Sequence, residues 1–278
     1  MKSKQRLIIC LNLLIVLFFQ NACVFQTTKT DDGTITVTVL GNDNVIVQGN
    51  NVIVKKVQGN GVIVEKEFEI KDYHKINIEG AFDINYSITD SPFFEISTDE
   101  NILEYIDVYV KNNTLHIKVK KEQSGTCYNL SPTKLNINSS SSTLSAISIA
   151  GSGDVDIQSD LFTESFSIKV SGSGDVKNKG VIKTTDLKID IAGSGDISLC
   201  GEAKNATMSI AGSGDINLRS FSIENVDCSV SGSGDMKLAV KEKLIYAIAG
   251  SGDITYTGEP RILEGSVSGS GTIKKINE

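Results

Sequence analysis

Residues 147–157 read ISIAGSGDVDI, and this stretch decides the fold of the chain. Apolar residues alternate with polar ones on both sides of a Gly-Ser-Gly-Asp motif, as in two short strands joined by a bend. Related motifs follow at spacings of 21, 21, 19, 20, 18 and 19 residues. The first glycines of the seven motifs are Gly151, Gly172, Gly193, Gly212, Gly232, Gly250 and Gly269. Self-similarity at this period predicts a solenoid rather than a globular fold of unlike parts.

A single coil of this kind cannot bury its apolar face, so we expect equivalent coils to stack. At a spacing of ~4.8 Å each strand can hydrogen-bond its copy in the next coil, parallel and in register. We therefore predict an all-β fold, a right-handed, single-stranded parallel β-helix (solenoid) with coils of ~20 residues. Within each motif, glycines such as Gly151 and Gly153 either point inward along an extended chain or supply positive φ in a sharp bend.

The alternation places the serine and the aspartate of each motif on the outside, where they form a polar ladder. Its members are Ser152, Asp154, Ser173, Asp175, Ser194, Asp196, Ser213, Asp215, Ser233, Asp235, Ser251 and Asp253. Like charges ~5 Å apart repel by ~0.8 kcal/mol per pair in water, so serine hydroxyls, turn N–H groups or a cation must offset the aspartate column. Each aspartate either caps a turn through its own backbone or belongs to a cation-binding or ligand-binding ladder. The seventh motif has Thr272 in place of aspartate.

The N-terminus has the features of a bacterial export signal. Three basic residues precede the apolar run 7–19, which predicts a signal peptide over residues 1–22. Ala22 before Cys23 resembles a lipobox, in which Cys23 is lipidated, although Gln20 stands where such motifs usually have Leu, Val or Ile. The alternatives are a soluble secreted protein cleaved at the same place and an uncleaved anchor.

The remaining chain divides into three predicted segments. Residues 23–33 are polar and are expected to form a tether. Residues 34–66 contain short strand-like repeats, which form either the first rungs of the solenoid or a small separate sheet. The β-helix domain is expected over residues 67–278, with the repeated coils at 147–273.

Local signals are sparse in the first part of this domain. Residues 99–106 have the pattern of one helical turn, and Asn112-Asn113 between two alternating runs predicts a hairpin turn. His74 and His116 lie in alternating β runs, out of phase with their apolar neighbours, and are expected to face solvent.

Charge and cysteine content exclude several classes of function. The net charge is −7, and removal of the first 22 residues leaves 24 basic and 34 acidic residues, which argues against nucleic-acid binding. Cys127, Cys200 and Cys228 form neither a disulfide framework nor a zinc pattern, and we interpret them as small buried side chains. We predict no metal and no cofactor.

Several segments together resemble one known family. They are residues 67–70 (EFEI), 78–84 (IEGAFDI), 99–103 (DENIL) and 115–119 (LHIKV), followed by the serial Gly-Ser-Gly-Asp turns. With these segments the chain resembles the bacterial "putative auto-transporter adhesin, head GIN domain" family across the predicted β-helix domain. The resemblance implies an exported protein, often a lipoprotein of Bacteroides-type bacteria, with a right-handed parallel β-helix. It implies no functional residues.

These observations lead to an expected function without predicted catalytic residues. We expect a non-catalytic cell-envelope lipoprotein, adhesin-like, in the outer membrane and held to the lipid only through Cys23. Its partner would be an unknown surface glycan or envelope protein. One alternative is a secreted or periplasmic carbohydrate-active, polysaccharide-processing β-helix enzyme, although identical aspartates do not offer the two unlike carboxylates that such catalysis needs. Another is a purely structural envelope spacer.

Overall fold

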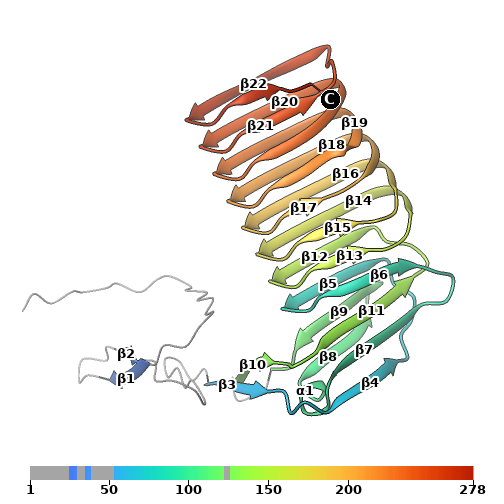
Figure 1. Ribbon diagram of the computed structural model, residues 1–278, viewed down its shortest axis with the longest axis vertical. Helices are drawn as coiled ribbons and strands as arrows, with labels where there is room; N and C mark the ends of the chain where they lie inside the picture. Colours follow the sequence, from blue (N-terminus) through green and yellow to red (C-terminus); the bar gives the residue numbers. More distant parts are fainter. Residues whose placement is uncertain (1–24, 30–34, 39–52, 122–125, 278) are drawn as a thin grey trace, which may run out of the picture.

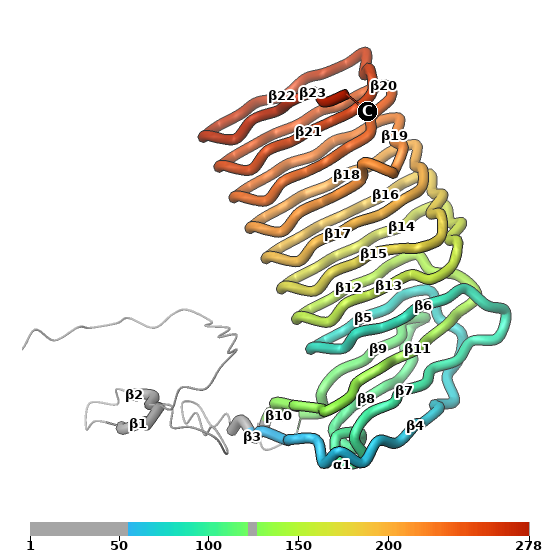
Figure 2. Tube along the Cα trace, viewed as in Figure 1, coloured from blue at the N-terminus to red at the C-terminus, as the bar shows by residue number. Residues whose placement is uncertain are grey.

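The computed structural model describes residues 25–29, 35–38, 53–121 and 126–277, and Figure 1 shows their arrangement. The predicted solenoid is confirmed: parallel strands stack coil upon coil along one axis (Figures 1 and 2). The predicted signal peptide and Cys23 lie outside the described residues.

Each coil contributes a strand that ends at the first glycine of a motif. These strands are β5 (Lys75–Gly80), β12 (Ala146–Gly151), β14 (Leu161–Gly172), β16 (Ile182–Gly193), β18 (Gly201–Gly212), β19 (Ile216–Gly232), β20 (Met236–Gly250) and β22 (Ile262–Gly269). They pair in parallel, each with the next, and glycine lies opposite glycine throughout. The spacing of the motifs in the sequence therefore sets the register between neighbouring strands.

A second, shorter wall follows each motif. It contains β6 (Ile84–Ile88), β13 (Val155–Ile157), β15 (Val176–Asn178), β17 (Ile197–Ser198), β21 (Ile254–Thr257) and β23 (Ile273–Lys275), together with the first residues of β19 and β20. Apolar side chains from both walls fill the interior. Ile147, Ile149, Val155 and Ile157 are each at most 1% exposed, as the alternation predicts.

The two glycines of each motif have different tasks. Gly172 has a φ of +139°, which L side chains rarely adopt, and a Cβ there would lie 2.1 Å from the carbonyl oxygen of Gly151. Gly174 points inward, where a Cβ would lie 2.2 Å from the carbonyl oxygen of Gly153. Both suggestions from the sequence thus apply, one to each glycine, because adjacent coils touch backbone to backbone at this corner.

The stack contains one more turn of this kind than the seven motifs indicate. Gly80 lies in register with Gly151, and residues 80–83 read GAFD, so Phe82 stands where the other turns have glycine. Gly153 lies directly over the backbone of Phe82. The turn at Gly80 is the first in the stack, because antiparallel pairing begins below it.

Antiparallel strands close the lower end of the solenoid. The elements are β4 (Ile63–Phe68), β7 (Phe93–Asp99), α1 (Glu100–Leu103), β8 (Ile106–Lys111), β9 (Thr114–Val119) and β11 (Leu135–Ser141). β9 continues the parallel wall below β5, whereas β8 pairs with it antiparallel. β11 pairs in parallel with β6 and antiparallel with β7, which in turn pairs antiparallel with β4.

Local predictions in this part are confirmed. The helical turn is α1, and the hairpin between β8 and β9 has Asn112 and Asn113 at φ of 51° and 57°. Among the residues described, no helix is long and apolar enough to cross a membrane.

The strands before the solenoid do not form its first rungs. β1 (Phe25–Lys29) and β2 (Ile35–Thr38) pair antiparallel, and β3 (Ile53–Gln58) pairs in parallel with β10 (Thr126–Ser131) in a separate two-stranded sheet. Residues 39–52 of the predicted repeat segment lie outside the described residues.

Candidate ligand-binding site at the base of the solenoid

The candidate site lies on the outer face of the sheet where the parallel coils meet the antiparallel base. Alternation along β6, β11 and β7 buries Ile84, Ile137 and Phe94, so the intervening polar residues face outward. The strand register then places Asn85 opposite Asn138, and Asn138 opposite Glu95.

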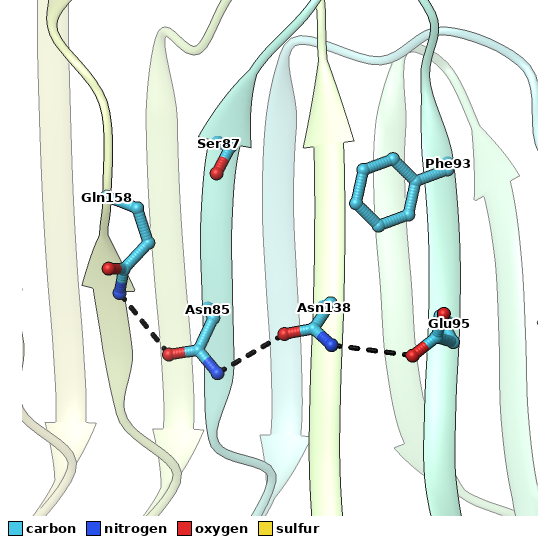
Figure 3. Close-up of a pocket in the computed structure, with 6 residues that line it drawn as sticks. All are labelled: Asn85, Ser87, Phe93, Glu95, Asn138 and Gln158. Carbon is cyan, nitrogen blue, oxygen red and sulfur yellow. Dashed lines mark hydrogen bonds between the residues drawn. The ribbon is translucent and has the colours of Figure 1, made fainter. Parts of the chain in front are cut away.

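These side chains join in a hydrogen-bonded row. Gln158 Nε2 donates to Asn85 Oδ1 at 3.3 Å, Asn85 Nδ2 donates to Asn138 Oδ1 at 3.3 Å, and Asn138 Nδ2 donates to Glu95 Oε1 at 3.5 Å (Figure 3). We call these four residues the amide row. Lys179 Nζ donates to Gln158 Oε1 at 2.7 Å, so the row begins beside a cation and ends on a carboxylate. All its bonds point in one direction, which favours mutual polarisation.

An open pocket of about 390 Å³ lies over the amide row, and Ser87 and Phe93 complete its lining (Figure 3). This volume falls in the range of small-ligand pockets, ~300–1,000 Å³. Hydrogen bonds among the described residues leave the Ser87 hydroxyl, one N–H of Asn138 and one oxygen of Glu95 for a ligand. The pocket therefore combines donors, acceptors and one aromatic ring.

Two buried oxygens flank the row. Within the described part of the chain, Ser97 Oγ and Asp156 Oδ1 are the buried side-chain oxygens without a hydrogen-bond partner. Asp156 lies opposite Asn85 in the register, and Ser97 follows two residues after Glu95 on the same side of β7. Buried polar atoms are ordinarily satisfied, so two exceptions beside one pocket mark this face as unusual.

Lysines from the next coil adjoin this end of the row. Asp156 Oδ2 lies 3.9 Å from Lys177 Nζ and 3.6 Å from Lys179 Nζ. Because both lysine side chains are well exposed, these pairs contribute little to stability. They do place positive charge at the Gln158 end of the pocket.

The predicted polar ladder has a clear structural geometry. The Asp175 N–H donates to Asp154 Oδ1 at 2.9 Å, and the Asp196 N–H donates to Asp175 Oδ1 at 2.8 Å. The same bond recurs from Asp83 at the bottom to Thr272 at the top. Each carboxylate thus caps the turn of the next coil rather than its own, and turn N–H groups offset the column of charge.

The ladder serines lie on the outer corner beside these aspartates. Ser152, Ser173, Ser194, Ser213, Ser233 and Ser251 are exposed. Among the residues that the structure describes, no group of three or more His, Cys, Asp or Glu side chains could hold a metal ion.

The histidines do not join the amide row. His116 is half-buried on β9, where its ring stacks on Tyr109 with centroids 4.8 Å apart, and Lys118 Nζ lies 5.1 Å from the Tyr109 ring centre. Desolvation lowers the pKa of His116, partly opposed by the charge of Glu79. His74 is also half-buried, rather than fully solvent-facing as the sequence suggests.

The three cysteines of the solenoid domain are free. Cys228 is buried, and burial raises the pKa of its thiol to about 12, as expected of a small core side chain. Cys127 and Cys200 are only partly buried, and the Cys200 thiol donates to the carbonyl oxygen of Gly180 at 3.1 Å.

Sequence reasoning did not find the amide row. Asn85, Asn138 and Glu95 come from strands far apart in the chain, and only the register of three unlike strands brings them together. The alternation of Asn136 and Asn138 with apolar residues is that of an ordinary half-buried strand, so it does not single out these amides.

Comparisons with known proteins agree with this architecture. The family described as "Putative auto-transporter adhesin, head GIN domain" matches residues 72–260. A solved "putative adhesin" from Bacteroides fragilis is 29% identical, with a TM-score of 0.72, over 79% of this chain and 100% of that one. A "putative lipid binding protein" from Parabacteroides distasonis is 30% identical, with a TM-score of 0.69, over 80% and 100%.

A solved "putative adhesin" from Parabacteroides merdae is 26% identical, with a TM-score of 0.64, over 80% of this chain and 99% of that one. A search of curated proteins gives no match. The family match spans well over half of the chain and lies on the β-solenoid with its closed base. The chain therefore belongs to the family described as "Putative auto-transporter adhesin, head GIN domain".

Proposed function

We propose that this chain is a non-catalytic recognition module of the bacterial cell envelope, and that its amide row binds a surface glycan. The observation that carries the proposal is the hydrogen-bonded row from Gln158 to Glu95 in a pocket with Phe93. A lipid on Cys23 would hold the module at the membrane, and the solenoid would carry the pocket on a rigid support.

The chemistry of the pocket suits a saccharide. Sugar hydroxyls both donate and accept, and the pocket offers the Ser87 hydroxyl, the Asn138 N–H and the Glu95 carboxylate as complementary partners. A pyranose ring also has a C–H face that packs against an aromatic ring such as Phe93. Because the row is already hydrogen-bonded, its side chains are pre-oriented and lose little freedom on binding.

The same lining argues for recognition rather than cleavage. Glycoside hydrolysis ordinarily needs two carboxyl groups about 5–10 Å apart on either side of the bond. Glu95 is the one carboxylate among the six residues that line the pocket. The polar lining also suits a hydroxyl-rich ligand better than an acyl chain. We therefore do not extend to this chain the description "putative lipid binding protein" that one relative carries.

A glycan array with the full chain tests the proposal. We expect Asn138→Ala and Phe93→Ala each to weaken binding at least about tenfold, since each removes a hydrogen bond or packing worth ~1.4 kcal/mol. Asn217→Ala is the matched control, because Asn217 is an exposed asparagine on the same wall, three coils above Asp156. Equal binding by all three variants would remove the amide row from the function.

A further inference from the structure

The upper end of the solenoid is open. Leu263 on β22 lies in register with Leu244 on β20, yet Leu263 is 45% exposed whereas Leu244 is fully buried. Val267 is likewise 42% exposed above Ile248, which is 2% exposed. These side chains occupy core positions of the coil, and they are exposed because the described chain places no further coil over them.

The edge of β22 is also left uncovered by the residues that the structure describes. It pairs with β20 on one side, and all eight of its residues are exposed. Glu264 is its one charged residue, and it contains no proline. Natural sheets usually blunt a free edge with charges, proline or a covering element, and solenoids usually end in a polar cap. Glu264 is the only such feature on β22, and the described residues place no covering element over it.

Another coil stacked in the same direction would not fit this end. Every lower coil offers an aspartate oxygen to the turn above it, as Asp253 does to the N–H of Thr272. Thr272 has no carboxylate to offer to a following turn, so the column of acceptors stops at the last coil.

The same end of a second copy does fit. With two copies related by a twofold axis through Gly265, β22 pairs antiparallel with its counterpart. Leu263 then lies opposite Val267 of the second copy, and Glu264 lies opposite Ser266 of the second copy. Apolar side chains meet apolar ones, and no like charges face each other along the strand.

We propose that the open C-terminal end is an isologous interface with a second copy of this chain. The two solenoids join end to end, both edges of β22 are paired, and the exposed core positions become an uninterrupted interior. The two bases, each with its amide row, then lie at opposite ends of the assembly. Such a dimer presents two copies of the amide row, one at each end.

Sedimentation of the full chain in density-matched detergent gives the first test. We expect a dimer at micromolar concentration, and Leu263→Asp or Val267→Asp should give a monomer with unchanged circular dichroism. Phe162→Asp is the matched control, because Phe162 is 63% exposed on the flank of the solenoid and lies outside the proposed interface. A monomeric parent chain, or equal dissociation by Phe162→Asp, would overturn the proposal.

Cross-linking tests the register independently of these substitutions. A Glu264→Cys chain and a Ser266→Cys chain are mixed, allowed to exchange subunits and oxidised. We expect several-fold more covalent dimer from the mixture than from either variant alone or from the parent chain with its native cysteines. Equal yields in all samples would indicate non-specific association and would overturn the twofold register.

Discussion

The carboxylate of Asp196 accepts a hydrogen bond from the backbone N–H of Asp215, 2.8 Å away in the next coil. It is one link in a continuous chain of such bonds along the solenoid. The aspartate of each Gly-Ser-Gly-Asp motif therefore holds two adjacent coils together. This geometry makes the aspartate column a structural element first, whatever else it binds.

Replacement of Asp196 should test this role. Asp196→Ala leaves the Asp215 N–H without its acceptor, and we expect a loss of ~1–2 kcal/mol in the free energy of unfolding. Ser194→Ala, at the exposed serine of the same turn, should change stability by less than ~0.5 kcal/mol. Urea unfolding of both variants measures the difference. Equal stability would show that the carboxylate does not hold the turn.

The inner glycine of each motif should be more sensitive still. A Cβ at Gly174 would lie 2.2 Å from the Gly153 carbonyl oxygen and 2.9 Å from the Ile149 side chain, so the coils must separate to admit it. We expect Gly174→Ala to cost ~3 kcal/mol or more. Gly61→Ala is the comparison for backbone strain alone, because Gly61, unlike Gly174, has a positive φ and has no atom within 4 Å of the Cβ position, and its cost should be ~1 kcal/mol.

Thermal unfolding of the two glycine variants gives this comparison directly. A loss for Gly174→Ala no larger than that for Gly61→Ala would show that adjacent coils admit a Cβ at this corner, and would contradict the close contact.

The sequence predicts the solenoid well because its physics is local and repeated. The alternation at Ile147 and Ile149 gives the buried wall, and the motif spacing gives the register. The turn at Gly80 is harder to find, since Phe82 replaces the second glycine. Leu263 and Val267 have the pattern of buried residues, and only their place in the last coil exposes them.

The candidate site is less accessible to such reasoning. Asn85, Asn138 and Glu95 meet through one parallel and one antiparallel pairing, and neither recurs among the described strands. No short-range pattern specifies such a pairing, because it depends on how the base closes beneath the first coil.

The proposed anchor gives a prediction at the N-terminus. If Cys23 is lipidated, mass spectrometry of the mature chain should find a diacyl- or triacylglyceryl group on an N-terminal Cys23. Cys23→Ser should release the chain from the membrane fraction, because two or more acyl chains supply most of the membrane affinity. Cys127→Ser is the control and should leave the chain membrane-bound. An unmodified Cys23 in the mature chain would refute the anchor.

Acid should destabilise the base of the solenoid by protonating Asp99. This residue is fully buried at the end of β7, and its oxygens accept from the Thr133 N–H, the Thr133 hydroxyl and the Gly61 N–H, each at 2.7 Å. Desolvation raises the pKa of Asp99, but these hydrogen bonds together outweigh it and hold the pKa at about 2. The carboxylate thus ties β4, β7 and the segment after β10 together.

The sign of the pH effect follows from the lowered pKa. The unfolded chain binds a proton on Asp99 near pH 3.8 and the folded chain near pH 2, so the stabilisation is complete above pH 3.8 and is lost as the pH falls towards 2. We expect Asp99→Asn to be less stable than the parent at neutral pH, with a difference that shrinks across this window. Asp90→Asn, at an exposed position, is the control. A stability difference that stays constant from pH 6 to pH 2 would show that Asp99 acts through packing and not through its charge.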